Sequence, residues 1–526
     1  MIRVRQVKVP ITDNNEQTII LKIATKLNVS IKRIKNYNIT KKSIDARDKK
    51  NIFYVYEFDV LVENENDILI KNKSKDILKT PEESYKFLIT GTVKMKHKPV
   101  IVGSGPAGLF CAYLLAENGY NPIIIERGEK IEERVNTVEK FFKDNILNKN
   151  SNVQFGEGGA GTFSDGKLNT LTKDKYNRGK KVFEIFVENG APKEILYENK
   201  PHIGTDLLRG VIINIRNKII EMGGVFKYDT CLTNLIIKDS KITGIELNNK
   251  EILNCDSLVL AIGHSARDTF KMLLSNNVDI TSKPFAVGIR IQHPQKLINE
   301  AQYGKNKNLP NASYKLVYNT KSKRGVYSFC MCPGGYVVNS SSDLGETVIN
   351  GMSNYKRDSI NANSAIVVTV SEKDYGTGPL DGIKFQEKLE SLAYELGDGK
   401  IPTQLYIDYK NNRNTKQFGS VKPVFKGDYN FTNINDIFPN YINQALVEGI
   451  EYFSKKIKNF NLDDAIISAV ESRTSSPVRI NRNERFMSNI YGIYPCGEGS
   501  GYSGGITTSA IDGVKVAEKI AQIYMN

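Results

Sequence analysis

The sequence lacks the features of membrane and secreted proteins. Its 526 residues hold no apolar run near the length of about eighteen residues that a membrane span needs. Residues 1–17 lack the uninterrupted apolar segment of a secretory signal. Only six cysteines are present, and no spacing among them is typical of a zinc site or a disulfide framework. We therefore expect a cytoplasmic protein with reduced thiols and no metal.

Acidic residues are fewer than basic residues, and the basic excess is concentrated near the N-terminus. The net charge is +15, and residues 1–96 alone hold 20 Lys and Arg against 12 Asp and Glu. Such a basic module could bind nucleic acid or an acidic partner. The other interpretation, which we prefer, is a composition rich in Lys, Asn and Ile throughout, with no such partner. The oligomeric state stays open.

The first hundred residues predict a small α+β module. Residues 2–9 alternate apolar and charged, which indicates a half-buried strand, and residues 16–28 carry apolar side chains at helical spacing. Two more strands are predicted within 31–45 and 52–62. The run "VKMKHKP" then predicts a hinge into the next domain.

From Lys98 onward the sequence predicts a strand, a glycine turn, a helix and a second buried strand. The turn reads Gly103-Ser104-Gly105-Pro106-Ala107-Gly108, and Glu126 follows the second strand. This pattern is typical of dinucleotide binding, since the glycines allow a tight turn, close approach of a pyrophosphate and close helix packing. The helix N-terminus attracts the phosphates, and the acidic residue accepts hydrogen bonds from a ribose.

The C-terminal run "IYPCGEGSGYSGG" resembles the terminal Gly-Asp signature of FAD-binding flavoproteins, with Glu498 in place of the aspartate. The resemblance implies that Gly497-Glu498 binds the ribityl chain. It also implies that the helix from about Ile506 points its N-terminus at the flavin and stabilises the reduced anion. The run "LVLAIGHS" is similar to the Ala-Thr-Gly turn of the same proteins, with Ile262 in place of threonine.

From Lys98 to the C-terminus the chain resembles the bacterial FAD-dependent dehydrogenases of the glutathione-reductase-like FAD/NAD(P)-binding superfamily. Within it, the chain resembles a group of FAD-dependent oxidoreductases, through "FGEGGAGTFSDGKL", "KPFAVGIRIQHPQ", "FCMCPGG", "NANSAIVVTV", "ESRTSSPVRI" and "YPCGEGSGYSGGI". The run "KKSIDAR" extends the likeness to the N-terminal module.

The resemblance implies an α/β fold with three parts. These are a Rossmann-like FAD-binding domain of the three-layer ββα type, an inserted β-rich substrate domain and the small N-terminal α+β module. The expected boundaries are 1–97 for the basic module, 98–283 and 462–526 for the two parts of the FAD-binding domain, and 284–461 for the substrate domain.

The run "QFGEGGAGTFSDGKL", residues 154–168, raises the question of a second nucleotide site. The residues before it predict no buried parallel strand, and Asp165-Gly166 predicts a turn where a helix would be needed. Glycines also allow a backbone to approach a flat ligand closely. In related flavoproteins such a loop lies along the flavin, which implies contact by Gly158 to Thr162 and places Ser164 to Lys167 at the mouth of the active site. A flexible loop without ligand contact is the alternative.

These arguments give one set of expected FAD-binding residues, completed by Arg127 next to Glu126, by Leu232, and by Lys167 near the flavin N1–O2 edge. The set is Gly103, Ser104, Gly105, Pro106, Ala107, Gly108, Glu126, Arg127, Gly158, Gly159, Ala160, Thr162, Lys167, Leu232, Gly263, Gly497, Glu498, Gly505 and Ile506.

The catalytic residues stay unassigned, and several side chains carry two interpretations. In a strand, Cys330 and Cys332 would face one side without a comfortable bridge, so they are either a redox pair or small residues facing the flavin or the core. Cys496 is expected to be buried. Arg473 and Arg479 either clamp an acidic substrate or serve internal pairing, for example with Glu471, or the surface. His264 and His202 are either proton donors or structural.

The sequence thus predicts an FAD-dependent oxidoreductase, a dehydrogenase or reductase that moves hydride or electrons through flavin N5 to or from an unidentified substrate. Only one full strand–G-x-G-x-x-G–helix unit is evident, so either NAD(P)H binds transiently in the substrate cleft or the electrons arrive from elsewhere. Two alternatives are a flavoprotein acting on or beside RNA through the basic module, and a non-catalytic flavin electron carrier.

Overall fold

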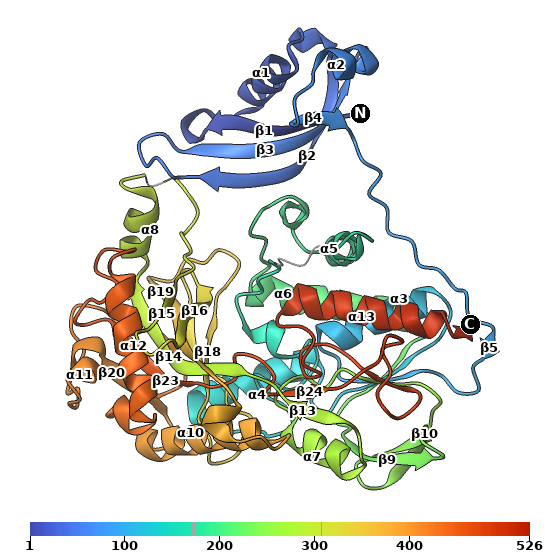
Figure 1. The fold of residues 1–526 in the computed structure, drawn as a ribbon, viewed down its shortest axis with the longest axis vertical. Helices are drawn as coiled ribbons and strands as arrows, with labels where there is room; N and C mark the ends of the chain where they lie inside the picture. The colour runs from blue at the N-terminus through green and yellow to red at the C-terminus, as the bar shows by residue number, and fades with distance from the viewer. Residues whose placement is uncertain (170–173, 307) are drawn as a thin grey trace.

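The computed structural model describes residues 1–169, 174–306 and 308–526. Three β-sheets of four, five and seven strands organise this part of the chain. Figure 1 shows a small N-terminal unit at the top, above two larger units. The mixed α/β architecture agrees with the predicted fold class.

The N-terminal unit is an antiparallel sheet in the order β2-β3-β1-β4. Helix α1 (Glu16–Leu27) packs Ile19, Ile23 and Leu27 against the apolar face of this sheet. Helix α2 and strand β4 come in addition to the four elements that the sequence predicts. The other elements are β1 (Ile2–Pro10), β2 (Ile34–Asp45), β3 (Phe53–Val62), α2 (Glu65–Lys71) and β4 (Ile77–Lys79).

The segment that connects the N-terminal unit to the next unit contacts the C-terminal region of the chain, whereas the sequence predicts a hinge there. Strand β5 (Val93–Lys94) pairs in parallel with β26 (Tyr524–Met525) at the C-terminus (Figure 1). The Tyr85 hydroxyl donates to Glu518 at 3.0 Å. The contacts join segments more than 400 residues apart, so local sequence patterns did not reveal them.

The second unit is a three-layer ββα sandwich. Its parallel sheet has the order β25-β12-β6-β7-β8 and draws strands from three distant parts of the chain. Helices α3, α5, α6 and α13 share one core, and the antiparallel meander β9-β10-β11 packs on the opposite face of the sheet. The strands are β6 (Val100–Val102), β7 (Ile123–Ile125), β8 (Val225–Lys227), β9 (Leu232–Lys238), β10 (Lys241–Leu247), β11 (Glu251–Asn254), β12 (Leu258–Leu260) and β25 (Ile493–Pro495); the helices are α3 (Pro106–Glu117), α5 (Arg178–Glu188), α6 (Thr205–Glu221) and α13 (Ile506–Ala521).

The third unit contains a seven-stranded sheet in the order β15-β16-β19-β14-β23-β20-β22. Strand β23 (Ile466–Glu471) lies between β14 and β20. The sheet therefore runs past residue 461, where the sequence places its end, because a short apolar strand looks alike in either sheet. The other strands are β14 (Phe285–Pro294), β15 (Val317–Asn319), β16 (Gly325–Cys332), β19 (Asn361–Val370), β20 (Ile401–Leu405) and β22 (Tyr429–Phe431), flanked by α8 (Gln295–Tyr303), α10 (Asp381–Gly397), α11 (Tyr406–Lys410) and α12 (Asn440–Phe453).

The two faces of this sheet differ in polarity, yet both are buried. Val287, Ile289 and Ile291 of β14 point into the helix-covered core. Alternate residues such as Arg290 and Gln292 are also fully buried. Strands β17 (Tyr336–Asn339) and β18 (Ile349–Met352) pack against the second face, where Arg290 donates to Asn350 of β18, so polar side chains lie in a solvent-poor layer.

Candidate active site

The site begins at the glycine turn between β6 and α3. A Cβ on Gly108 would lie 1.8 Å from the Gly103 carbonyl oxygen, so only glycine lets the first turn of α3 rest on the strand end. Helix α3 begins at Pro106, and its N-terminal end borders a cavity through Gly105, Pro106 and Ala107. The N–H groups and partial positive charge of a helix N-terminus suit an anion there.

Glu126 organises this turn from the end of β7. One carboxylate oxygen accepts hydrogen bonds from the Ser104 N–H at 2.9 Å and hydroxyl at 2.7 Å. The other accepts the N–H groups of Gly128 at 3.0 Å and Gly156 at 3.1 Å. Four donors of the chain thus meet a group with about four lone-pair positions. A ribose would have to share these positions, so the first role of Glu126 is to fix three backbone segments.

The glycine-rich run, residues 154–168, forms a compact loop that packs against the same turn. The Gly158 N–H donates to the Ser104 carbonyl oxygen at 2.9 Å, and a Cβ on Gly159 would lie 3.0 Å from the Gly105 Cα. Residues Ala160–Phe163 form a single 3-10 turn. The loop therefore lines the same cavity as the glycine turn.

Arg134 holds this loop in shape. It is fully buried on α4 (Ile131–Asp144), and its guanidinium stacks over the Phe163 ring at 4.8 Å. Burial lowers its pKa to about 10, which still leaves it charged at neutral pH. It donates to five loop carbonyl oxygens, those of Asn152, Val153, Gly156, Glu157 and Gly159, at 2.6–3.2 Å.

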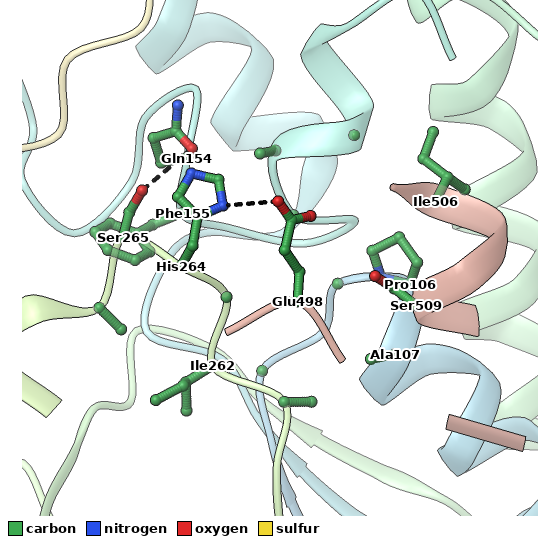
Figure 2. Close-up of a pocket in the computed structure, with 18 of the residues that line it drawn as sticks. Pro106, Ala107, Gln154, Phe155, Ile262, His264, Ser265, Glu498, Ile506 and Ser509 are labelled. Atoms are coloured by element: carbon green, nitrogen blue, oxygen red, sulfur yellow. Dashed lines mark hydrogen bonds and ion pairs between the residues drawn. The ribbon is translucent and has the colours of Figure 1, made fainter. Parts of the chain in front are cut away.

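One cavity collects most of the expected residues, and Figure 2 shows part of its wall. It is lined from both large units, with Gln154 and Glu498 on one and Cys330 and Thr474 on the other. The expected residues that line it are Gly103, Gly105, Pro106, Ala107, Glu126, Arg127, Gly159, Ala160, Lys167, Leu232, Gly263, Glu498, Gly505 and Ile506.

Five expected residues lie behind the wall and support it. Ser104 is fully buried against Glu126, and Gly108 lies in the first turn of α3, against the Gly103 carbonyl. Gly158 ties the loop to the turn, and the Thr162 carbonyl accepts the Thr205 hydroxyl at 2.6 Å. The Gly497 N–H donates to Asp512 at 2.8 Å.

Glu498 reaches into the cavity toward a histidine. Its carboxylate lies 3.3 Å from His264 Nδ1, and Figure 2 shows the two side chains pointing at each other. The Nε2 of His264 is buried without a partner among the described residues. His202, in contrast, lies outside the cavity wall, contacts the Tyr355 carbonyl at 2.9 Å, and has a pKa lowered by burial.

Lys167 turns toward the third unit. Its ammonium donates to the Met331 carbonyl oxygen in β16 and lies 3.9 Å from Asp165. Burial lowers the pKa of Lys167, but negative charge at Cys332, Cys330 and Asp165 outweighs this effect, so the pKa of Lys167 is raised overall. The side chain thus links the glycine-rich loop to the C-x-C segment.

Arg473 and Arg479 occupy different environments, and only Arg473 lines the cavity. Arg473 lines the cavity, but its guanidinium is taken by Glu390 at 2.7 Å and Asp343 at 3.0 Å, so it pairs internally with partners other than Glu471. Glu471 pairs with Arg290 at 3.0 Å. Arg479 lies outside the cavity wall, above the Tyr502 ring at 5.3 Å.

The geometry fits FAD. A Cβ added to Gly263, Gly504 or Gly505 would meet nothing within 4 Å, so the backbone there borders open space that a flat ligand can fill. The α3 N-terminus lines the same cavity, and such a helix start suits a pyrophosphate. The buried His264 Nε2, which has no partner within the described part of the chain, adds a polar group that can bind a ligand.

Comparison with known proteins agrees with this geometry. A family model described as the C-terminal domain of FAD-dependent proteins matches residues 284–474, and an NAD(P)-binding Rossmann-like domain matches residues 101–152. A domain of unknown function matches residues 1–61. An uncharacterised protein of Clostridium beijerinckii is 48% identical over 531 residues, and the match covers 99% of each chain.

The chain belongs to a family of FAD-dependent proteins. Among solved structures, the flavoprotein is similar to an E. coli quinol fumarate reductase FrdA, with 11% identity over 81% of this chain and 70% of that chain and a TM-score of 0.36. It is also similar to an L-proline dehydrogenase of Pyrococcus horikoshii, with 15% identity over 81% and 94% of the chains and a TM-score of 0.33. Among the described residues, no helix is both long and apolar enough to cross a bilayer.

Sequence reasoning missed several residues of the flavoprotein's site. Arg134 carried a signal, because it occupies the apolar i, i+3, i+7 stripe formed with Ile131, Val138 and Phe141. A charged residue on such a stripe needs buried partners. Asn350 and Thr474 also line the cavity, but they reach it only through pairing of distant strands, which left no local pattern.

Proposed function

We propose that the flavoprotein catalyses transfer of hydride or electrons between bound FAD and a small substrate held where the two large units meet. The observation that carries this proposal is a cavity lined by residues of both units. When bound, FAD supplies two-electron chemistry at flavin N5. Substrates that undergo saturation or desaturation of a C–C or C–N bond suit this chemistry.

The residues of the second unit would hold the cofactor in an extended form. The N-terminus of α3 would receive the pyrophosphate, while Glu126, Arg127 and Leu232 would surround the adenosine half. The loop from Gly158 to Thr162 would lie along the flavin. The N-terminus of α13 at Ile506 would stabilise negative charge on the reduced ring.

The residues of the third unit would meet the substrate. Phe329, Asn350 and Thr474 line this side of the cavity and offer an aromatic face, an amide and a hydroxyl. NAD(P)H, if it is the donor, would enter this side too, because the part of the chain that the structure describes holds one strand–G-x-G-x-x-G–helix unit.

The basic module does not add a second function to the proposal. Several of its cations face carboxylates, among them Arg3 with Asp59 at 2.8 Å and Lys42 with Glu198 at 2.8 Å. A cation already paired in this way has less charge to offer to a phosphate backbone.

The test is anaerobic mixing of the FAD-loaded protein with NADH, then NADPH, while flavin absorbance is followed. Bleaching by one of them identifies the donor. If neither bleaches it, dithionite reduction followed by reoxidation with a quinone is expected, and the donor is then an organic substrate or a protein. A bound FAD that stays oxidised under all these conditions contradicts the proposed redox role.

A further inference from the structure

The C-x-C segment of β16 departs from a regular strand. Its pairing with β19 shifts register between Phe329 and Cys332, so that two residues of β16 face one residue of β19. Cys330 has a φ of +42°, in the left-handed region that non-glycine residues rarely adopt. Bulges and such backbone outliers cluster near functional sites, where they re-aim a side chain. Here Cys330 lines the cavity and Cys332 is fully buried.

The bulge replaces the regular alternation that the sequence suggested and brings the two cysteines into contact. The Cys332 thiol donates to the Cys330 carbonyl oxygen at 3.3 Å, and both residues are free thiols. A hydrogen bond from the Cys332 side chain lowers the pKa of Cys330 well below its usual range. Burial opposes this shift, while Lys167 and Arg290 add to it.

Cations surround this segment from two sides. The Lys167 ammonium binds the Met331 carbonyl, between the two cysteines, and Arg290 donates to the Cys330 carbonyl at 3.1 Å. Arg290 is balanced by Glu471 at 3.0 Å.

The remaining charged and titratable neighbours leave one positive charge in excess. Asp165 is shared by Lys167 and Arg357, whose Nε lies 2.9 Å from it. Burial lowers the pKa of His202 and raises that of Tyr314, which keeps both neutral near pH 7. Three cations therefore face two carboxylates, and a thiolate would complete the balance.

We propose that Cys330 and Cys332 form a dithiol–disulfide pair that exchanges two electrons with the flavin in this cavity. The inference rests on the proposed function, since it requires FAD beside β16. It makes the protein a carrier of two redox centres and names Cys330 as a catalytic residue, with Cys332 as its resolving partner.

The exchange balances without a further reactant. Oxidation of the pair forms the Cys330–Cys332 S–S bond and breaks the Cys332 S–H bond. Two electrons and that proton pass to the oxidised flavin, which becomes the reduced anion. Lys167 stays protonated throughout and compensates first the thiolate and then the charge of the reduced ring.

The direct test counts electrons in the FAD-loaded protein. After oxidation with diamide, the wild type is expected to consume about twice as much dithionite per FAD as Cys330→Ser or Cys332→Ser, because each centre takes one electron pair. The control Cys255→Ala removes a buried thiol outside the cavity and should match the wild type. Equal consumption by the wild type and both serine variants overturns the proposal while leaving the flavin role intact; absence of FAD from the wild type overturns the proposed function instead.

A second test uses the reduced thiols and does not depend on turnover. Alkylation by iodoacetamide, resolved by mass spectrometry, compares Cys330 with Cys231, which lines the same cavity and whose pKa is raised by burial. At pH 7, Cys330 should react at least about tenfold faster. Lys167→Met should move its reaction midpoint to higher pH, and Lys167→Arg should restore it. Equal rates at the two cysteines, or a Lys167→Met midpoint that does not move, contradict the proposal.

Discussion

At the scale of single residues, the site depends on buried charged groups that bind backbone. Glu126 gathers N–H groups from three segments, and Arg134 gathers carbonyl oxygens from one loop. Both replace hydrogen bonds that a regular helix or strand would provide. Hydrogen bonds within the protein therefore fix the shape of this part of the cavity wall.

Replacement of Glu126 by glutamine tests this view. In Glu126→Gln, an amide NH₂ would face N–H donors, so the flavin-free protein should lose about 2–3 kcal/mol in the free energy of unfolding. FAD affinity should fall as well, since Ser104 and Gly156 lose their anchor. Urea unfolding and FAD titration measure the two effects. Glu133→Gln, on the exposed side of α4, should change stability by less than about 0.5 kcal/mol. Equal behaviour of the two variants would refute the role assigned to Glu126.

At the scale of elements, the contact between β6 and α3 is the feature that sequence predicted best. The glycine spacing, the proline at the helix start and the acidic residue after β7 all act over short distances, so they leave a readable pattern. The bulge in β16 and the place of β23 depend on which strands pair, and such pairing is not encoded locally. For the same reason the sequence does not predict the contact between Lys167 and β16.

The close packing under α3 gives a matched pair of glycine variants. Gly108→Ala should cost about 3 kcal/mol or more, because its Cβ would lie 1.8 Å from the Gly103 carbonyl oxygen. Gly210→Ala, in α6, meets nothing within 4 Å and should stabilise the protein by about 0.5–1 kcal/mol. Thermal and urea unfolding compare the two. A tolerated Gly108→Ala would mean that α3 does not rest on the strand end.

At the scale of the whole molecule, a buried charge cluster joins the two large units beside the cavity. Arg267, at the start of α7 (Arg267–Ser275), contacts Glu346 at 2.6 Å and Glu390 at 2.8 Å. Arg473 contacts the same Glu390. These contacts connect α7 of the second unit to the third unit beside the cavity.

This cluster predicts a pH dependence. Burial, with the neighbouring Glu390, raises the pKa of Glu346 to about 8, although Arg267 and Arg473 oppose the shift. The folded state then binds a proton that the unfolded state has released, so stability falls as pH rises from about 4.5 to about 8. Glu346→Gln should remove this loss, whereas Glu395→Gln on the exposed part of α10 should keep it. Unfolding curves between pH 5 and pH 9 that coincide in shape for the wild type and Glu346→Gln would count against the cluster's role.

The claim on which the rest depends is that FAD fills the cavity between the glycine turn and the glycine-rich loop. The most direct measurement is the identity and amount of flavin released on denaturation, after incubation of the purified protein with excess FAD and FMN and removal of the unbound flavins. We predict FAD in equimolar amount to the chain and little FMN, because only the dinucleotide fills both halves of the site. A protein that retains no flavin, or retains FMN as well as it retains FAD, would contradict the account.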